Sequence, residues 1–203
     1  MDYIKVNVIS HILSVFFYDP KDIFADESEE LFKEYEEVIR DYGSEYLDVF
    51  KNIKNSFYQL DLEELRVDYA KLFVGPFKLL AYPYGSVYLE EEKLLNGITT
   101  KEVEKLYLRA NLELSDVKNV TADHIAVELE FISYMAHKLS ENSNDNESLE
   151  ILSEFIEKYY RPFASQLSKD IIKNAETEFY KNIGKMLELF TESLSNLDLS
   201  KKY

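Results

Sequence analysis

The 203-residue sequence contains no cysteine. Disulfide scaffolds, thiolate zinc sites, iron–sulfur clusters and thiol nucleophiles are therefore excluded from within this chain. Arginine is scarce too, with only four residues, and the formal net charge is −16. Because a nucleic-acid surface needs basic side chains to neutralise phosphates, we expect no nucleic-acid partner. An acidic surface favours cationic ligands or basic peptides, although solubility alone also explains it.

The sequence also lacks targeting and membrane-spanning signals. Its N-terminus has neither the basic region nor the small-residue cleavage site of a secretory signal. The longest uncharged stretch there, residues 6–18, is too short to cross a bilayer. We therefore expect a cytoplasmic protein that does not insert stably into membranes. Residues 1–203 are long enough to form a single domain with one sizeable core.

Apolar residues recur at helical spacing through nearly the whole chain. Eight stretches each carry one apolar stripe: residues 4–15, 31–42, 46–57, 65–72, 103–110, 125–139, 152–159 and 179–194. Alternation with a period of two, bounded by turn residues, is not evident. The pattern predicts an all-α fold, a single globular bundle of about eight to ten helices without a sheet.

Local signals mark where these helices begin and end. Three capping-box patterns predict helix starts at residues 26–29, 61–64 and 99–102. Thr121 is predicted to cap the long helix that follows it, and Gly43 to end an earlier one. The helix that carries Leu152 is predicted to end near Pro162, because proline lacks an amide hydrogen.

Two segments interrupt the helical pattern. Residues 140–148 form a polar loop that could act as a hinge. Helical segments could exchange between chains through this hinge, so we expect a monomer or a domain-swapped dimer. Residues 75–97, called the connector below, hold three of the five glycines and two of the four prolines, yet are rich in apolar and aromatic side chains. Loops are normally polar because their backbone faces water. The connector therefore either packs into the helical body or offers a binding surface.

His124 is a candidate metal ligand, since it follows Asp123 and lies four residues before Glu128. At this spacing His124 and Glu128 could provide two metal ligands, and the neighbouring Asp123 carboxylate could orient the imidazole. A complete site needs three or four ligands, so a helical metal-binding protein or enzyme that uses His124 and Glu128 is an alternative hypothesis only. A simpler interpretation is that Asp123 complements the helix dipole and His124 is a satisfied polar residue.

Other catalytic and cofactor patterns are missing. Ser86 follows Gly85 but does not lie in a Gly-x-Ser-x-Gly elbow, and neither phosphate-binding glycine pattern occurs. The runs of acidic residues are typical of solvated helix faces. We therefore expect an interaction protein that has no catalytic residues, no metal and no cofactor.

Two blocks of sequence carry a family resemblance. Residues 69–76 and 83–89 match Tyr-x-x-Leu-Phe-x-Gly-Pro and Pro-aromatic-x-Ser-Val-Tyr-Leu, and residues 123–131 match Asp-His-x-x-x-Glu-Leu-x-Phe. Together they resemble the TorD/DmsD/NarJ-type redox-enzyme maturation chaperones, over roughly residues 65–167. Thr121 stands where the family has a proline before Asp-His, and Tyr84 where it often has tryptophan, which leaves the client enzyme open.

The resemblance implies a cytoplasmic chaperone without turnover. Such proteins bind the twin-arginine signal peptide, or the apo form, of a molybdenum-cofactor oxidoreductase before its export. We expect the peptide-binding cleft to be formed by Tyr84, Ser86, Tyr88, Asp123, His124 and Glu128. The backbone of the cleft is expected to be fixed by Gly75, Pro76, Pro83 and Gly85. Carboxylates suit the two arginines of such a peptide, and an apolar groove suits its remainder.

Overall fold

The computed structural model describes residues 2–22, 28–75, 78–113 and 120–195, and within them the expected all-α fold is confirmed. The α-helices are α1 (Tyr3–Val15), α2 (Ser28–Ile39), α3 (Ser44–Phe57), α4 (Leu62–Tyr69), α5 (Gly85–Leu89), α6 (Ile98–Arg109), α7 (Ile125–Glu141), α8 (Asn146–Phe155), α9 (Arg161–Asn174) and α10 (Glu178–Ser195). Short 3₁₀ turns cover Pro20–Asp22 and Arg40–Tyr42, and π-helical turns cover Ala70–Val74 and Ile156–Tyr160. The described residues contain no β-strand, only an isolated antiparallel bridge between Tyr84 and His124.

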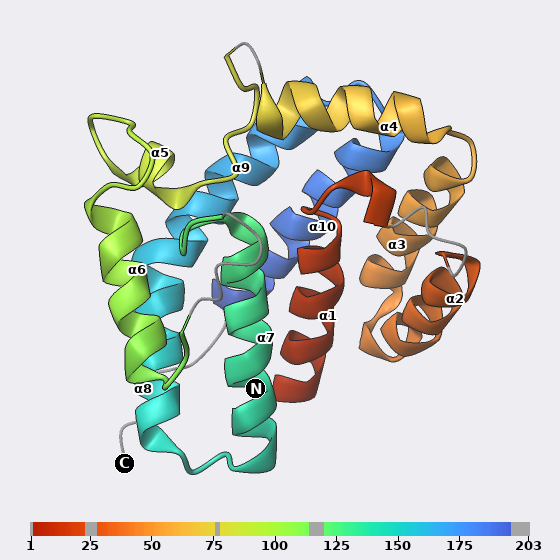
Figure 1. The fold of residues 1–203 in the computed structure, drawn as a ribbon. Helices are drawn as coiled ribbons and strands as arrows, with labels where there is room; N and C mark the ends of the chain where they lie inside the picture. Colours follow the sequence, from red (N-terminus) through yellow and green to blue (C-terminus); the bar gives the residue numbers. More distant parts are fainter. Residues whose placement is uncertain (1, 23–27, 76–77, 114–119, 196–203) are drawn as a thin grey trace.

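The helices pack around one hydrophobic core. In Figure 1, α1 and α7 run side by side in the middle, α2 and α3 lie on one side, α6 and α8 on the other, and α4 crosses the top. Aromatic rings join the N-terminal part of the chain to α10: Phe16 lies 6.1 Å from Phe32 and 5.8 Å from Phe179, and Phe57 lies 5.8 Å from Phe179, between ring centroids. All four rings are buried, and most residues of the predicted apolar stripes lie in the core, but Ile4 is 60% exposed and Val38 39% exposed.

Some predicted helix boundaries are confirmed. Asp61 caps α4, and its carboxylate and that of Glu64 exchange hydrogen bonds with each other's backbone amides. Gly43 ends the 3₁₀ turn after α2 with a φ of +113°, a conformation that favours glycine. The capping box predicted at residues 26–29 begins outside the described residues.

Two predicted helix caps are wrong. Helix α6 begins at Ile98 rather than after Thr99, and the Thr99 amide donates to Glu90 Oε1 over 2.6 Å, so the capping carboxylate comes from the preceding loop. Helix α7 is capped by His124, whose Nδ1 accepts from the Ala126 amide over 3.2 Å. The Thr121 hydroxyl instead donates to Asp123 Oδ1.

The helix expected to end near Pro162 continues through it. A π-helical turn widens the helix just before this point, and Pro162 lies in the first turn of α9, where its missing amide costs little. The polar loop expected over residues 140–148 is shorter, because α7 extends to Glu141 and Asp145 caps α8 by accepting from the Ser148 amide over 3.0 Å. Only residues 142–145 connect the two helices.

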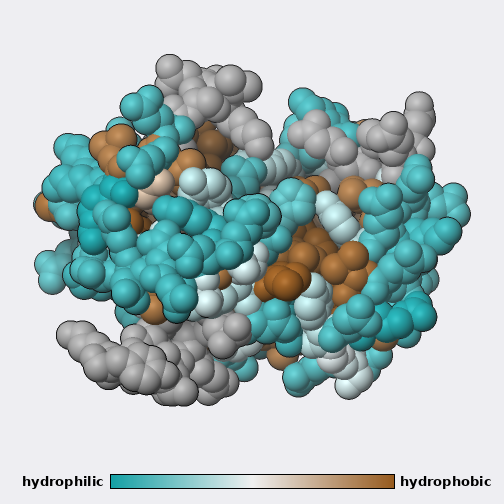
Figure 2. Space-filling model, turned by 90° about the horizontal axis from the view of Figure 1, so that it is seen from below, coloured by the Kyte–Doolittle hydropathy of each residue, from teal (hydrophilic) through white to brown (hydrophobic). Residues whose placement is uncertain are grey.

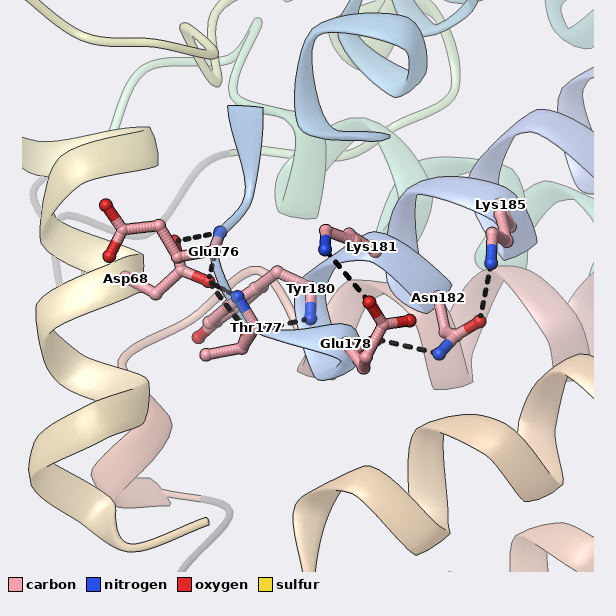
Figure 3. A network of polar contacts seen from close by, with 8 residues as sticks. All are labelled: Asp68, Glu176, Thr177, Glu178, Tyr180, Lys181, Asn182 and Lys185. Atoms are coloured by element: carbon pink, nitrogen blue, oxygen red, sulfur yellow. Dashed lines mark hydrogen bonds and ion pairs between the residues drawn. The ribbon is translucent and has the colours of Figure 1, made fainter. Parts of the chain in front are cut away.

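A buried carboxylate ties α4 to the start of α10 (Figure 3). Asp68 is 1% exposed and accepts hydrogen bonds from the Glu176 amide, the Thr177 amide and the Thr177 hydroxyl, the last at 2.7 Å. These bonds give hydrogen-bond partners both to the buried carboxylate and to the backbone amides that precede α10. They fix the end of α4, from which the chain leads through Gly75 into the connector.

The surface is mainly hydrophilic, as the net charge of −16 requires. Figure 2 looks at the end of the molecule opposite α4 and shows a large group of hydrophobic atoms between hydrophilic flanks, with smaller groups elsewhere on this face. None of the described helices is both long and apolar enough to cross a bilayer.

Candidate functional site

The connector folds against the residues that precede α7. The Gly85 amide donates to the Asp123 carbonyl over 2.8 Å, and the Ile125 amide donates to the Pro83 carbonyl over 2.9 Å. These two bonds form the isolated bridge between Tyr84 and His124. Residues 38 positions or more apart in sequence are thereby brought together, and both come from the blocks that the sequence analysis singled out.

Asp123 holds the start of α5. Its side chain is fully buried, and Oδ2 accepts from the Ser86 amide over 2.8 Å, while Oδ1 accepts from the Thr121 hydroxyl over 2.6 Å. A carboxylate at the first turn of a helix satisfies an amide that has no partner within the helix. Asp123 therefore complements α5 of the connector, and His124 caps α7.

His124 is enclosed by aromatic rings. Its ring meets the Tyr84 ring edge-on at 5.1 Å between centroids and stacks on the Tyr18 ring at 6.3 Å. Because Nδ1 accepts from the Ala126 amide, this nitrogen carries no proton. The Tyr18 hydroxyl donates to Glu130 Oε1 over 2.9 Å, which links α1 to the same face of α7.

Glu128 lies beneath the connector and is fully buried. Within the described part of the chain, neither of its carboxyl oxygens has a hydrogen-bond partner. A Cβ added to Gly85 would lie 3.4 Å from Glu128 Oε1 and 3.6 Å from Asp123 Cβ, so the connector backbone is in close contact with both acidic residues. Burial first, and the negative charge of Asp123 second, raise the pKa of Glu128 well above its usual range.

Tyr88 contacts α9. Its hydroxyl donates to Asp170 Oδ2 over 2.8 Å, and its ring packs on Phe163 at 5.4 Å between centroids. Burial raises the pKa of Tyr88, and the Asp170 carboxylate adds to this effect. Beside it lies a hollow of about 460 Å³ between the connector and α9, lined by Lys78, Leu79, Leu80, Tyr82, Val87, Tyr88, Lys93, Gln166, Asp170 and Asn174.

The predicted site residues thus separate into two groups. Ser86, Asp123, His124 and Glu128 lie together but are buried or nearly so, whereas Tyr84 and Tyr88 are half-buried. Of the four backbone positions, Pro83 and Gly85 are at the bridge and Gly75 turns the chain with a φ of +92°. Pro76 lies outside the described residues. Of the six side chains, only Tyr88 lines the hollow beside the connector.

Sequence reasoning missed the partners that come from distant helices. Phe163 and Asp170 on α9 contact Tyr88, and Tyr18, just after α1, stacks on His124. No local pattern marks these three positions, because their pairing depends on tertiary packing. The sequence also gave no signal for a second hollow, of about 510 Å³, between the end of α3, α4 and the start of α10, which includes Glu63, Glu64, Asp68, Glu176 and Glu178 in its lining.

The residues of the metal hypothesis, His124 and Glu128, lie in the same part of the structure. Among the described residues, no group of three or more histidine, aspartate or glutamate side chains is arranged to hold a metal ion. His124 Nδ1 is engaged by the Ala126 amide, and Glu128 lies inside the protein. The geometry of the described residues therefore offers no support for the alternative based on His124 and Glu128.

Comparisons with known proteins cover the same region. A family model described as nitrate reductase delta subunit matches residues 43–169, which include the connector, α7 and most of α9. The chain is similar to Chaperone protein TorD of Vibrio parahaemolyticus, with 28% identity over 130 residues (63% of this chain and 60% of that protein), and to that of Aliivibrio salmonicida, with 26% over 132 residues (64% and 61%). These matches span about 60% of the length of the relatives.

A solved structure shares the fold. The crystal structure of a candidate redox enzyme maturation protein from Archaeoglobus fulgidus superposes with a TM-score of 0.56 and covers 94% of each chain. The two sequences are 21% identical, so this likeness concerns the fold alone. Because it covers 94% of this chain, the likeness extends beyond residues 43–169 of the family model.

Proposed function

Because the chain belongs to the nitrate reductase delta subunit family, we propose that it is a chaperone for the maturation of a redox enzyme, which binds its partner and catalyses no reaction. The TorD relatives carry the name of chaperones, and the sequence lacks the nucleophile and phosphate-binding patterns of common enzymes. The connector and the start of α7, where both resembling blocks meet, are the proposed binding site.

The proposed client is a molybdenum-cofactor oxidoreductase in its apo form, bound in the cytoplasm through a twin-arginine signal peptide. The net charge of −16 supports a cationic partner, because opposite charges speed encounter and stabilise the complex. An apolar, aromatic connector suits the apolar segment of such a peptide. Both properties are required of a receptor for this class of leader.

One observation carries the proposal: the connector is held on α7 by backbone hydrogen bonds and by the Asp123 carboxylate, with a hollow of about 460 Å³ next to it. In this arrangement Tyr84 and Tyr88 are the exposed part of the site. Ser86, Asp123, His124 and Glu128 lie underneath and hold the connector in shape. The peptide would first contact the two tyrosines and the hollow.

The test is a calorimetric titration of the protein with a synthetic twin-arginine leader peptide. We expect the Tyr84→Ala and Tyr88→Ala variants to bind at least about tenfold more weakly, since buried aromatic anchors dominate such interfaces. Tyr58→Ala is the matched control, because Tyr58 is 50% exposed at the end of α3 and lies outside the proposed site. Unchanged affinity in both site variants would refute the assignment of the site.

Ionic strength provides a second arm of this test. Contacts between carboxylates and arginines weaken as salt screens them, so the affinity should fall markedly from low to high ionic strength. An affinity that is independent of salt would instead indicate capture of the apolar segment alone.

A further inference from the structure

Two buried acidic residues lie side by side beneath the connector. Asp123 and Glu128 are both fully buried, but only Asp123 is hydrogen-bonded, to the Ser86 amide and the Thr121 hydroxyl. Both oxygens of Glu128 lack partners among the described residues. Buried polar groups are rarely left without partners, so a carboxyl group in this state calls for an explanation.

Among the described residues, no positively charged group contributes to the shifted pKa of Glu128. Asp123 is the charged residue that acts on it, and the tyrosines whose pKa responds to it are Tyr107 on α6 and Tyr160 on the π-helical turn before α9. The Ser86 hydroxyl of α5 is itself buried and without a partner in the described chain. His124, one turn earlier, presents an unprotonated Nδ1 to the Ala126 amide.

Two buried carboxylates that lie close together repel each other when both are charged. Burial and the negative charge of Asp123 raise the pKa of Glu128 and so favour its protonated form. A cation could replace that proton if it also supplied hydrogen bonds. Guanidinium has five N–H donors in a planar fork that matches carboxylates, whereas a single proton satisfies only one oxygen.

The cover over these two residues is short. Helix α5 has five residues, and three hydrogen bonds join this part of the connector to the start of α7: from the Gly85 amide, the Ser86 amide and the Ile125 amide. Two of them end on Asp123, the Gly85 amide on its carbonyl and the Ser86 amide on its carboxylate, so a cation that binds the carboxylate competes directly with the second bond. The glycine at position 85 closes the site because its backbone lies against Glu128.

We propose that Asp123 and Glu128 form a closed cation site, which an arginine side chain of the bound peptide enters when the connector lifts, and that Glu128 then releases its proton to solvent. This inference rests on the proposed function, because it takes the peptide from it. The guanidinium keeps its charge throughout, the Glu128 O–H bond breaks, and the pair of carboxylates becomes ionised around the arginine. Peptide binding is thereby coupled to loss of a proton.

The experiment is calorimetry with the twin-arginine peptide at pH 7 in two buffers of different ionisation enthalpy, phosphate and Tris, on the full chain. The difference between the two heats gives the number of protons released. We expect the natural protein to release protons when it binds the peptide, at most one per peptide. Glu128→Gln should release none and bind at least about tenfold more weakly, because the amide leaves one carboxylate for the guanidinium.

Glu102→Gln is the matched control, since Glu102 is an exposed glutamate on α6 paired with Lys105, and it should release the same number of protons as the natural protein. Peptide binding without proton release, or release that persists in Glu128→Gln, overturns the cation site but leaves the proposed function standing. Failure of the natural protein to bind the peptide overturns both. The natural protein alone decides the proposal if the variant does not fold.

Discussion

Asp68 and Glu128 are equally buried, yet their surroundings differ completely. Asp68 accepts from two backbone amides and one hydroxyl, whereas Glu128 has no hydrogen-bond partner in the described part of the chain. The first arrangement stabilises the fold, because a satisfied carboxylate holds α4 on the start of α10. The second does not, because burying an unpartnered carboxyl group costs free energy. The protein therefore uses one buried acid for structure and keeps another at a cost to stability.

Their positions agree with this division. Asp68 lies at the end of α4, before the chain enters the connector, and the bonds in Figure 3 fix that end. Glu128 lies in the first turn of α7, against the connector glycine. The connector thus follows a helix end that Asp68 fixes, and it lies against a Glu128 carboxyl group that has no hydrogen-bond partner among the described residues. This is the arrangement expected if the connector, and not the helical body, changes on binding.

The largest effect is expected at Asp68. Asp68→Ala removes the acceptor of three hydrogen bonds and leaves two amides before α10 without a partner, so the free energy of unfolding should fall by about 3 kcal/mol. Urea unfolding measures this. Glu63→Ala, an exposed acidic position on the same helix, is the control and should change it by less than about 0.5 kcal/mol. Similar losses in both variants would show that the buried Asp68 carboxylate does not stabilise the fold through its hydrogen bonds.

Replacing Glu128 should increase the free energy of unfolding rather than decrease it, and the size of this increase depends on pH. Its pKa is raised in the folded state above the usual value of 4.5, so the folded protein binds more protons than the unfolded chain between these two values. Stability is therefore lost as pH rises through this window. Relative to Glu128→Gln, the natural protein should lose at most about 1.4 kcal/mol per pH unit.

The measurement is urea unfolding of the natural protein and Glu128→Gln from pH 5 to pH 8. We expect the glutamine variant to become the more stable of the two as pH increases. A constant difference between the two proteins across this range would show that Glu128 is already ionised in the folded protein.

A third carboxylate, Glu90, sharpens the comparison because it is hydrogen-bonded but not buried. It accepts from the Thr99 amide over 2.6 Å, and this bond lowers its pKa. Glu90→Ala should cost about 1 kcal/mol, as for other lost helix caps. Thermal unfolding measures this loss, with Glu91→Ala at the exposed neighbouring position as the control. An equal shift in melting temperature for both variants would mean that Glu90 does not cap α6.

The smallest effect is expected at Tyr88. Tyr88→Phe removes the hydroxyl that donates to Asp170 but keeps the ring on Phe163, so the free energy of unfolding should fall by about 1 kcal/mol or less. Tyr58→Phe is the control. A loss as large as that of Asp68→Ala would place the connector's anchor on α9 rather than on α7.

Much of this fold was predictable from local sequence. The stripe Tyr46, Phe50, Ile53 and Phe57 is buried along α3, and the capping box at Asp61 forms as its spacing requires. Periodicity and caps act within one helix, so they can be read without the partner. The passage of a helix through Pro162 could not be predicted, because it depends on the π-helical turn before it.

The sequence predicted which residues belong to the candidate site but not how deeply they are buried. The sequence placed Asp123, Glu128 and the connector in one neighbourhood through the family resemblance, yet their burial follows from the close contact of Gly85 with Glu128. The role of Asp68 was missed because its donors lie 108 and 109 residues later in the chain. Such pairings arise from tertiary packing and leave no local pattern.

Photo-crosslinking tests the central claim most directly, which is that the connector and its hollow receive the peptide. A twin-arginine leader that carries a photoreactive group beside its arginines is bound, irradiated, and its adducts are mapped by mass spectrometry. We expect adducts on residues 78–93 and on α9, where the hollow of about 460 Å³ lies. Adducts confined to the acidic hollow lined by Glu63, Glu64 and Glu178 would contradict it.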